Sequence, residues 1–354
     1  MYYHVLFCFL LLCNDSILGG HPKNLAWNGG PLHLNCEHGV DVWTKSGLYV
    51  KDNVIAIKAV TYKDDIFVIS PRVKRGVLAT VWLIVRGSDG VELQPFPELR
   101  HHEIYDCNGI QNAVDIYLDH LGLLWVLDTG VIETMESPRC TCPPKVVAIS
   151  TVVNKLTKRI ELSSLTEPTS VLQNVVVDYG LGGKPFVYVS DASRGAILVH
   201  EMSSGSEWTV LACGPAPSLQ FTLVKRGLAH SIILIRQHHP GLVELDTASL
   251  RRKNSIAPLI VYGEQSKPVI LVGSDLHHIY LRHTECSDVL SWDTRDGYNA
   301  SNFQNIHSAG PRLTTTSVSS GPLKHVLLVL DSNYADTAYT NEPTYHRITF
   351  IDKL

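Results

Sequence analysis

The chain has 354 residues, of which 45% are apolar and 18% charged, so it can bury a sizeable core and is neither disordered nor a charged coiled coil. Its formal net charge of −4 leaves no basic excess to neutralise a phosphate backbone, which argues against nucleic acid as a partner. Val, Ile, Leu, Thr and Tyr are abundant whereas only three Met occur, and this composition favours strands over helices.

The N-terminal segment has the pattern of an export signal. Residues 5–13 form an apolar run as long as the core of a signal peptide, and Gly19 and Gly20 follow at a plausible cleavage point. The run is shorter than the roughly 20 residues that a membrane span needs. We therefore expect residues 1–20 to be a signal peptide and residues 21–354 to be one secreted domain without a membrane span; a short anchor helix is the alternative.

A structural repeat follows. Six times, a short apolar run is followed by a second apolar run that ends in turn residues, and the first runs lie 45 to 63 residues apart. They are marked by Ile66, Leu124, Val187, Ile232, Ile279 and Leu327. Because a propeller blade of four strands takes about 40–50 residues, this spacing predicts an all-β, six-bladed β-propeller, with a sandwich or closed barrel as the alternative.

Near-continuous apolar runs are typical of strands covered on both faces. We therefore place the six marked runs on inner strands of the blades. We also expect the chain ends to close the last blade, with residues 40–42 pairing beside the C-terminal strand.

No motif in the chain marks an active centre. The Leu127-Asp128-Thr129-Gly130 stretch is like half of an aspartic protease, but that chemistry needs a second copy, and residues 331–333 lack the glycine. No nucleophile elbow, phosphate loop or His-Glu-x-x-His motif occurs. We therefore expect no metal and no cofactor, and the sequence indicates no catalytic residue.

Cysteine usage agrees with an oxidising compartment. Outside the signal segment the cysteines are Cys36, Cys107, Cys140, Cys142, Cys213 and Cys286. Six cysteines allow fifteen pairings, and the residues alone do not choose among them. The Asn299-Ala300-Ser301 sequence, in a polar stretch, is a glycosylation acceptor that we expect on a surface loop.

Several segments resemble the yellow / major royal jelly protein family of insects. The most specific is LWVLDTG at residues 124–130, followed by CPPKVV at 142–147, YVSD at 188–191 and YHRI at 345–348. The resemblance runs from about Trp43 to Ile348 and implies a secreted six-bladed propeller. It also implies a Cys107–Cys142 disulfide, with Cys140 as the rival partner.

The family resemblance implies several functions, because its members are linked to pigmentation, dopachrome conversion, biogenic-amine binding and storage. We expect a non-enzymatic binder of small aromatic amines or catechol-derived ligands, or a factor in cuticle pigmentation. The alternatives are an isomerase that converts dopachrome or dopaminechrome, and a structural or storage protein. The oligomeric state is left open.

If the apolar runs end at a channel, the residues at the ends of these runs cluster around one opening of that channel. The ligand-binding candidates are Arg72, Asp128, Thr129, Tyr188, Asp191, Tyr345 and Arg347. Carboxylates there would pair with a ligand ammonium, and a tyrosine would stack on its ring. The alternative is that Asp128 and Asp191 accept hydrogen bonds from backbone amides in turns.

Overall fold

The computed structural model describes residues 24–34, 37–236, 241–254, 259–264, 267–321, 323, 325–340 and 342–353. Their regular structure is mostly β-strand, joined by three short α-helices, α1 (Glu37–Lys45), α2 (Thr247–Leu250) and α3 (Tyr334–Thr340). Short 3₁₀ turns lie at Lys51–Asn53, Leu99–His102, Leu181–Gly183 and Ala300–Asn302. None of the described helices is both long and apolar enough to cross a membrane.

Four antiparallel sheets of four strands follow one another along the chain. The first has β2 (Lys58–Tyr62), β3 (Asp65–Ile69), β4 (Val81–Gly87) and β5 (Gly90–Pro95). The second has β6 (Ala113–Leu118), β7 (Leu123–Asp128), β10 (Lys145–Ser150) and β11 (Lys155–Glu161). The third has β12 (Leu172–Tyr179), β13 (Pro185–Asp191), β14 (Ala196–Glu201) and β15 (Ser206–Leu211). The fourth has β16 (Leu219–Arg226), β17 (Ala229–Arg236), β18 (Gly241–Asp246) and β19 (Leu259–Glu264).

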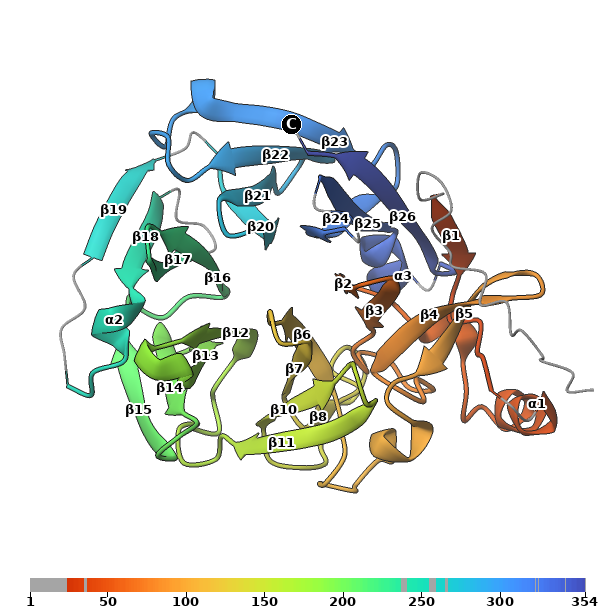
Figure 1. Ribbon diagram of the computed structural model, residues 1–354. Helices are drawn as coiled ribbons and strands as arrows, with labels where there is room; N and C mark the ends of the chain where they lie inside the picture. The colour runs from red at the N-terminus through yellow and green to blue at the C-terminus, as the bar shows by residue number, and fades with distance from the viewer. Residues whose placement is uncertain are drawn as a thin grey trace, which may run out of the picture.

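A larger sheet completes the ring, with strand order β1-β26-β25-β24-β20-β21-β22-β23. Its strands are β1 (Leu25–Asn28), β20 (Val269–Ser274), β21 (His278–His283), β22 (Asp288–Asp293), β23 (Phe303–Ser308), β24 (Thr314–Ser320), β25 (Val326–Ser332) and β26 (Tyr345–Asp352). A separate pair joins β8 (Val131–Ile132) to β9 (Arg139–Cys140). Figure 1 shows the sheets arranged around a central space, each with its edge towards the centre. The fold is therefore all-β and propeller-like, as the sequence predicts.

The two halves of the eight-stranded sheet meet at one parallel pair, Gly273 with Val318. A Cβ atom at position 273 would lie 1.7 Å from the Val318 carbonyl oxygen, so only glycine permits this close approach. The halves are β20 to β23 on one side and β24, β25, β26 and β1 on the other.

The chain ends close the ring, but with a different segment from the one expected. Strand β1 pairs antiparallel with β26, from Leu25 opposite Ile348 to Asn28 opposite Tyr345. The expectation that residues 40–42 pair there is wrong, because they lie in α1, where Val42 is 62% exposed. A strand of four residues gives little periodic signal, so the closing strand is hard to recognise in the sequence.

The six marked apolar runs lie in the second strand of each unit, not the innermost one. They fall in β3, β7, β13, β17, β21 and β25, whereas β2, β6, β12, β16, β20 and β24 lie nearest the centre. A second strand has a partner on both edges and sheets packed on both faces, so it is uniformly apolar. An innermost strand faces the centre and carries polar residues, as in the TTTSVSS sequence of β24.

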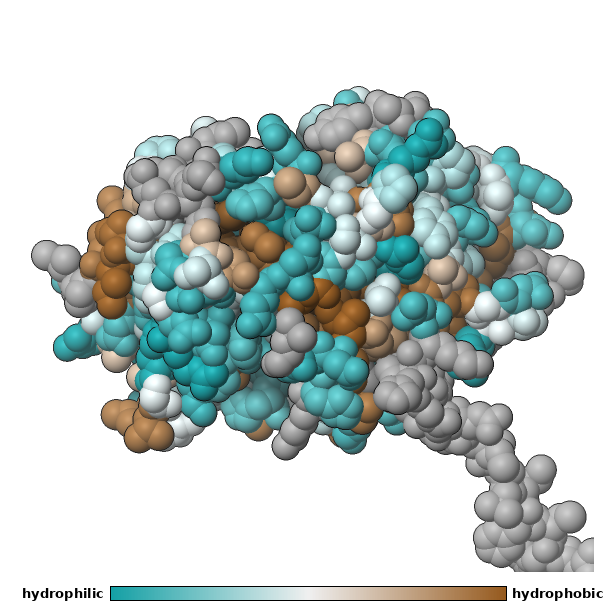
Figure 2. Space-filling model, turned by 90° about the horizontal axis from the view of Figure 1, so that it is seen from above, coloured by the Kyte–Doolittle hydropathy of each residue, from teal (hydrophilic) through white to brown (hydrophobic). Residues whose placement is uncertain are grey.

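The outer surface is mostly polar. Figure 2, a view onto outer strands, shows mostly hydrophilic residues with separate hydrophobic groups between them. In β19, however, Leu259, Ile260 and Val261 are each more than half exposed. Asn299 is exposed at the start of the 3₁₀ turn before β23, where it could accept a glycan; its glycosylation stays a prediction.

Trp27 anchors the closing strand, so its removal tests the closure. The side chain is 5% exposed and its ring stacks on that of His346, with 4.8 Å between centroids. We expect Trp27→Ala to lower the free energy of unfolding by about 3–5 kcal/mol, measured by urea denaturation. Val42→Ala, on the exposed face of α1, should change it by less than about 0.5 kcal/mol. Equal effects of the two variants would contradict this closure.

Two buried histidines make stability depend on pH. Burial lowers the pKa of His346 to about 3, and burial together with the Arg72 charge lowers the pKa of His102 to about 3. Because these groups titrate near 6.5 when unfolded, only the unfolded state binds their protons between about pH 6.5 and 3. Stability should therefore fall as pH drops through this window, by about 2.7 kcal/mol per pH unit for the two together. The variant His346→Gln keeps an acceptor for the Ala56 N–H. It should halve the slope of stability against pH, because one of the two histidines is removed. An unchanged slope between pH 6 and 4.5 would contradict the lowered pKa of His346.

Candidate functional site

A cavity of about 860 Å³ lies between the innermost strands, and we call it the central channel. Its lining comes from all six of these strands, β2, β6, β12, β16, β20 and β24, and from a few residues outside them. Because these strands are far apart in the sequence, the lining exists only in the closed ring.

Polar side chains at the channel tie most of the innermost strands to the next one. Lys58 Nζ lies 2.5 Å from Asp115 Oδ1, which joins β2 to β6. The other carboxylate oxygen of Asp115 accepts a 2.8 Å hydrogen bond from the Val175 N–H on β12. It also accepts one from the Asn174 side-chain amide at 3.2 Å.

Three further junctions are made in the same way, whereas β20 and β24 meet through the Gly273–Val318 backbone pair. Gln173 Oε1 accepts from the Leu219 N–H at 2.7 Å, and Gln220 Oε1 accepts from the Leu271 N–H at 3.0 Å. Ser317 Oγ accepts from the backbone N–H at position 59 at 3.3 Å. These groups are used in closing the ring, so they are not the first candidates for contacting a ligand.

At the end of the channel where β12 stops, a fully buried carboxylate holds a histidine. Asp178 Oδ1 accepts from His230 Nδ1 at 2.9 Å and from the Tyr179 N–H at 2.7 Å, and Asp178 also forms an ion pair with Arg251. Burial alone would raise the pKa of Asp178, but hydrogen bonds from His230 and Thr247 and the Arg251 charge bring it below its usual value. His230 lines the channel, with 28% of its side chain exposed.

Local turns and a helix cap position the two side-chain partners of Asp178. A tight turn between β16 and β17, with Gly227 at a φ of +61°, places His230 at the start of β17. Asp246 caps α2 by accepting from two backbone N–H groups, and Arg251 follows the helix. Thr247 Oγ1 donates to the His230 carbonyl oxygen at 2.8 Å, which fixes the histidine relative to α2.

Aromatic rings line the same end of the channel. The Tyr179 hydroxyl donates to Asp119 Oδ2 at 2.5 Å, and the His120 ring meets the Tyr179 ring edge-on, with 4.7 Å between centroids. Burial and the Asp119 charge raise the pKa of Tyr117 and of Tyr179, so both stay neutral phenols. Within the described part of the chain, no cation lies within ion-pair distance of Asp119.

A second ionised carboxylate at the channel lies after β20. Burial opposes ionisation of Asp275, but hydrogen bonds from Lys353 and the His278 backbone bring its pKa to about 2. Lys353 Nζ lies 2.9 Å from its carboxylate and the Tyr280 hydroxyl donates to it at 3.0 Å. Among the described residues no group of three His, Cys, Asp or Glu side chains could hold a metal ion.

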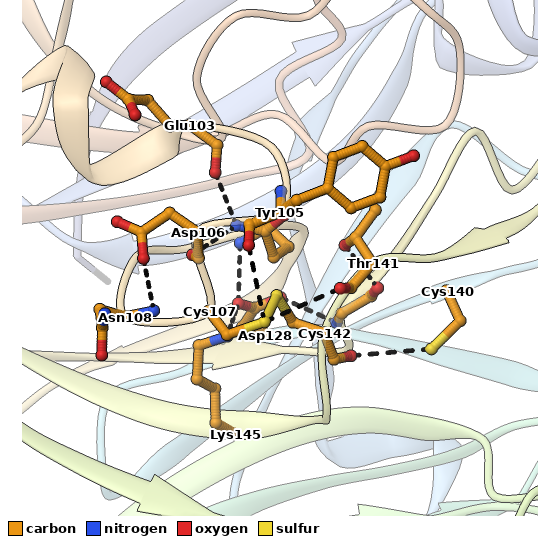
Figure 3. Close-up of a disulfide and its surroundings, with 12 residues drawn as sticks. Glu103, Tyr105, Asp106, Cys107, Asn108, Asp128, Cys140, Thr141, Cys142 and Lys145 are labelled. Atoms are coloured by element: carbon orange, nitrogen blue, oxygen red, sulfur yellow. Dashed lines mark hydrogen bonds and ion pairs between the residues drawn. A yellow bond between two sulfur atoms is a disulfide. The ribbon is translucent and has the colours of Figure 1, made fainter.

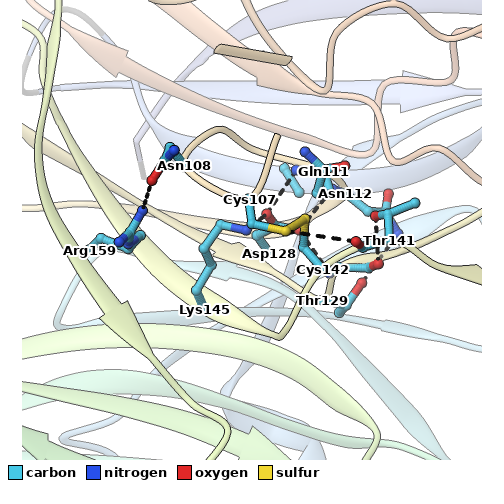
Figure 4. Close-up of polar contacts among 12 residues, drawn as sticks. Cys107, Asn108, Gln111, Asn112, Asp128, Thr129, Thr141, Cys142, Lys145 and Arg159 are labelled. Atoms are coloured by element: carbon cyan, nitrogen blue, oxygen red, sulfur yellow. Dashed lines mark hydrogen bonds and ion pairs between the residues drawn. A yellow bond between two sulfur atoms is a disulfide. The ribbon is translucent and has the colours of Figure 1, made fainter. Parts of the chain in front are cut away.

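The predicted site residues fall into three groups, and none of them lines the channel. In the first, Asp128 is fully buried and accepts from the N–H groups of Gln111, Asn112 and Gly130 at 2.8 to 2.9 Å. Lys145 Nζ lies 2.9 Å from Asp128 Oδ2, and both side chains are at most 1% exposed. Figure 4 shows this pair beside the loop that holds Gln111 and Asn112.

Arg72 and Thr129 belong to the same group through Asn112. The Asn112 side chain accepts from the Arg72 N–H at 2.6 Å and donates to Thr129 Oγ1 at 3.3 Å. The Arg72 guanidinium is 2% exposed, and burial lowers the pKa of Arg72 to about 10. It donates to four carbonyl oxygens, those of Val77, Leu78, His102 and Gln111.

Tyr188 and Asp191 form the second group, on β13. Tyr188 is buried in an apolar cluster between the third and fourth sheets. Asp191 is fully buried and accepts from the Val171 N–H at 3.0 Å and from the hydroxyls of Ser170 and Ser193.

The third group, on β26, holds Tyr345 and Arg347. Arg347 donates to Asp331 at 2.7 Å, and the Tyr345 N–H donates to the Asn333 side chain at 2.8 Å. Ligand contact by the seven residues stays a prediction. His230, Asp178 and Tyr179 are channel-end residues that the sequence reasoning missed.

The disulfide expected from the family resemblance is present. Cys107 bonds to Cys142, whereas the rival Cys140 is exposed and unbonded (Figure 3). Cys213 and Cys286 are also free thiols, and Cys36 lies outside the described residues, as does the expected signal peptide.

Comparison with known proteins supports the family resemblance. Residues 111–220 match the major royal jelly protein family. Protein yellow of Drosophila pseudoobscura pseudoobscura is 30% identical over 171 residues, and that of Drosophila melanogaster is 29% identical over the same length. These matches confirm the resemblance to the yellow / major royal jelly protein family that the sequence motifs indicate. The matched part covers 46% of this chain and 30–31% of those relatives, so the chain spans about a third of their length.

Solved structures agree on the fold alone. A luciferin-regenerating enzyme aligns with a TM-score of 0.51 at 10% identity, covering 85% of this chain and 94% of that one. A streptogramin B lyase aligns with a TM-score of 0.50 at 8% identity, covering 94% and 88%. Such low identities carry no conclusion about activity.

The buried Lys145–Asp128 pair gives a stability prediction for the region that matches the family. Lys145→Met leaves a buried carboxylate without its cation, so we expect the free energy of unfolding to fall by about 3–5 kcal/mol in urea denaturation. Lys155→Met, on exposed β11, is the control and should stay within about 0.5 kcal/mol. A loss below 1 kcal/mol for Lys145→Met would contradict a dependence of Asp128 on this cation.

The disulfide gives a second stability prediction. It closes a loop with a sequence separation of 35, and in the chain-entropy model such a loop contributes about 3–4 kcal/mol. The double variant Cys107→Ser/Cys142→Ser should lose about that amount in denaturation, whereas Cys140→Ser should lose almost none. A large loss for Cys140→Ser instead would favour the rival pairing.

Proposed function

We propose that this chain is a secreted binding protein that takes a small aromatic amine or a catechol-derived ligand in its central channel. The observation that carries the proposal is the channel end at Tyr179. There, the rings of Tyr117, Tyr179 and His120 line the channel, and the Tyr179 hydroxyl donates to the buried carboxylate of Asp119.

The chemistry of this channel end suits a cationic aromatic ligand. An ammonium group is attracted to the face of an aromatic ring, and a phenol that donates to a carboxylate has a more electron-rich ring. The Tyr179 hydroxyl donates to Asp119 in this way, and the raised pKa of Tyr179 keeps it a donor. A channel of about 860 Å³ is also within the range that small-molecule sites occupy.

We include six blades and a pigmentation role in the proposal. The halves of the eight-stranded sheet meet at one parallel pair only, which supports counting them as two blades beside the four separate sheets. A part in cuticle pigmentation would follow from a catechol-derived ligand, and the similarity to the yellow / major royal jelly protein family supports it.

Calorimetric titration with dopamine and serotonin tests the binding. We expect both amines to bind, and Tyr179→Ala to weaken binding about three- to thirtyfold through loss of the ring, whereas Tyr179→Phe keeps most of the affinity. Asp191→Asn is the matched control, because this buried carboxylate on the same sheet does not line the channel.

Three outcomes separate the alternatives. Loss of affinity in Tyr179→Ala with unchanged binding in Asp191→Asn supports the channel. The reverse pattern would place the ligand at the residues expected from the sequence. If neither amine binds to the unmodified chain, the proposed function is overturned.

A further inference from the structure

The turns that join each innermost strand to the second strand of its unit share an exposed leucine. Six such turns follow β2, β6, β12, β16, β20 and β24, and all but the first contain one. We call these residues the tip leucines; they are Leu121, Leu181, Leu228, Leu276 and Leu323. Leu181 is 95% exposed and Leu228 is fully exposed. Because five of the eight exposed leucines in the described part of the chain occupy equivalent turns, they are not the scattered apolar residues of an ordinary surface.

The six turns lie together at one opening of the central channel. Residues in or beside each turn contact those of the next sheet around the ring. The contacting pairs are Tyr62 with Gly122, Asp119 with Tyr179, Asp178 with His230, Lys225 with Leu276, and Ser320 with Thr61. The remaining neighbours, β20 and β24, run parallel, so their turns lie at the same end. The tip leucines therefore surround the opening of the channel at Tyr179.

Leu276 has a backbone conformation that leucine rarely adopts. Its φ of +75° lies in the left-handed region, which favours glycine. The Lys225 N–H holds this turn by donating to the Leu276 carbonyl oxygen at 2.7 Å, yet the Leu276 side chain stays exposed. Packing within the chain therefore does not offset the strain of leucine at this position. Strained residues of this kind cluster at functional sites.

We propose that the tip leucines insert into a lipid surface with zwitterionic headgroups and so dock this opening of the channel on it. The sheets surround one central space, so their turns at this end face the same way, as contact with an extended surface requires (Figure 1). Binding to a lipid surface grows with the apolar area that enters it. A fluid lipid layer receives each leucine without a preformed pocket.

The charges beside the tip leucines indicate the kind of headgroup. Lys63 is exposed in the one turn without a leucine, with Asp64 exposed next to it, and Lys184 is exposed in the turn of Leu181. Charges of both signs complement the phosphate and the quaternary ammonium of phosphatidylcholine. The described residues of these turns do not form the basic cluster that selects anionic lipids. We therefore expect the attraction to be apolar and little affected by salt.

The separation of the tip leucines favours lipid over a second copy of the chain as the occupant. A stable protein–protein interface buries about 800 Å² on each partner around a continuous, closely packed core. Each tip leucine instead stands on its own turn, among glycine, lysine, aspartate and histidine residues. These side chains therefore provide separate points of insertion and no continuous core.

Flotation with phosphatidylcholine vesicles tests the docking on the full chain. We expect the unmodified chain to float with the vesicles equally well in low and in high salt. The double variant Leu181→Ser/Leu228→Ser should bind about a hundredfold more weakly, since the burial of each leucine contributes about tenfold. Because both side chains are exposed, its thermal stability should equal that of the unmodified chain.

The matched control is Leu48→Ser/Leu211→Ser. It makes the same chemical change at two leucines that are 61% and 74% exposed but do not lie on the tips. Leu211 lies at the end of the third sheet where β12 begins, which is the end away from Tyr179. The control should float like the unmodified chain. Equal loss of binding in both double variants would assign the binding to general surface hydrophobicity and overturn the proposal.

Leu276→Gly separates lipid binding from folding. Glycine relieves the left-handed conformation, so thermal stability should hold or rise while vesicle affinity falls about tenfold. Unchanged affinity together with lower stability would show that Leu276 serves the fold and would overturn its insertion into lipid.

Two further outcomes would overturn the lipid surface as the occupant. One is an unmodified chain that does not float with the vesicles. The other is a chain that stays off the vesicles but sediments as a dimer, with the dimer lost in Leu181→Ser/Leu228→Ser, which would make a second copy the occupant. Neither outcome depends on amine binding, so the proposed function stands or falls separately.

Discussion

The ring depends on how the free edges of its innermost strands are satisfied. A backbone N–H that faces a neighbouring sheet without a partner would cost free energy comparable to a lost hydrogen bond. This cost is avoided at Val175, Leu219 and Leu271. The N–H of each donates to a side-chain oxygen on the innermost strand of the preceding sheet. The same requirement places carboxylate and amide groups along the central channel. The polar lining is therefore first a consequence of ring closure, and a ligand site consists of the groups that closure leaves available.

Two kinds of buried carboxylate follow from this arrangement. Asp128 and Asp191, at the ends of second strands, accept from backbone N–H groups and also pair with buried Lys145 and with serine hydroxyls, respectively; neither lines the channel. Asp178, near the end of an innermost strand, instead holds two side chains, those of His230 and Arg251, and the first of them lines the channel. The difference lies in strand position rather than in residue type or burial.

The sequence predicted the fold better than the site, and the reason is physical. Apolar runs such as residues 124–128 mark second strands, because those strands are covered on every side, and the spacing of the runs indicates a repeated sheet. Innermost strands such as β12 mix polar and apolar residues to serve both closure and core, so they give no clear period. His230 and Asp178 lie on different sheets, 52 residues apart, and only the ring brings them together. The short strand β1 is recognisable only once its pairing with β26 is known.

The most direct measurement of the central claim is a crystal structure of the chain with serotonin. The account predicts that the ligand lies in the central channel, with its ring against Tyr179. A ligand bound beside Arg72 and Asp128, or beside Tyr345 and Arg347, would contradict the channel as the binding site. Such a result would instead place binding at the residues expected from the sequence.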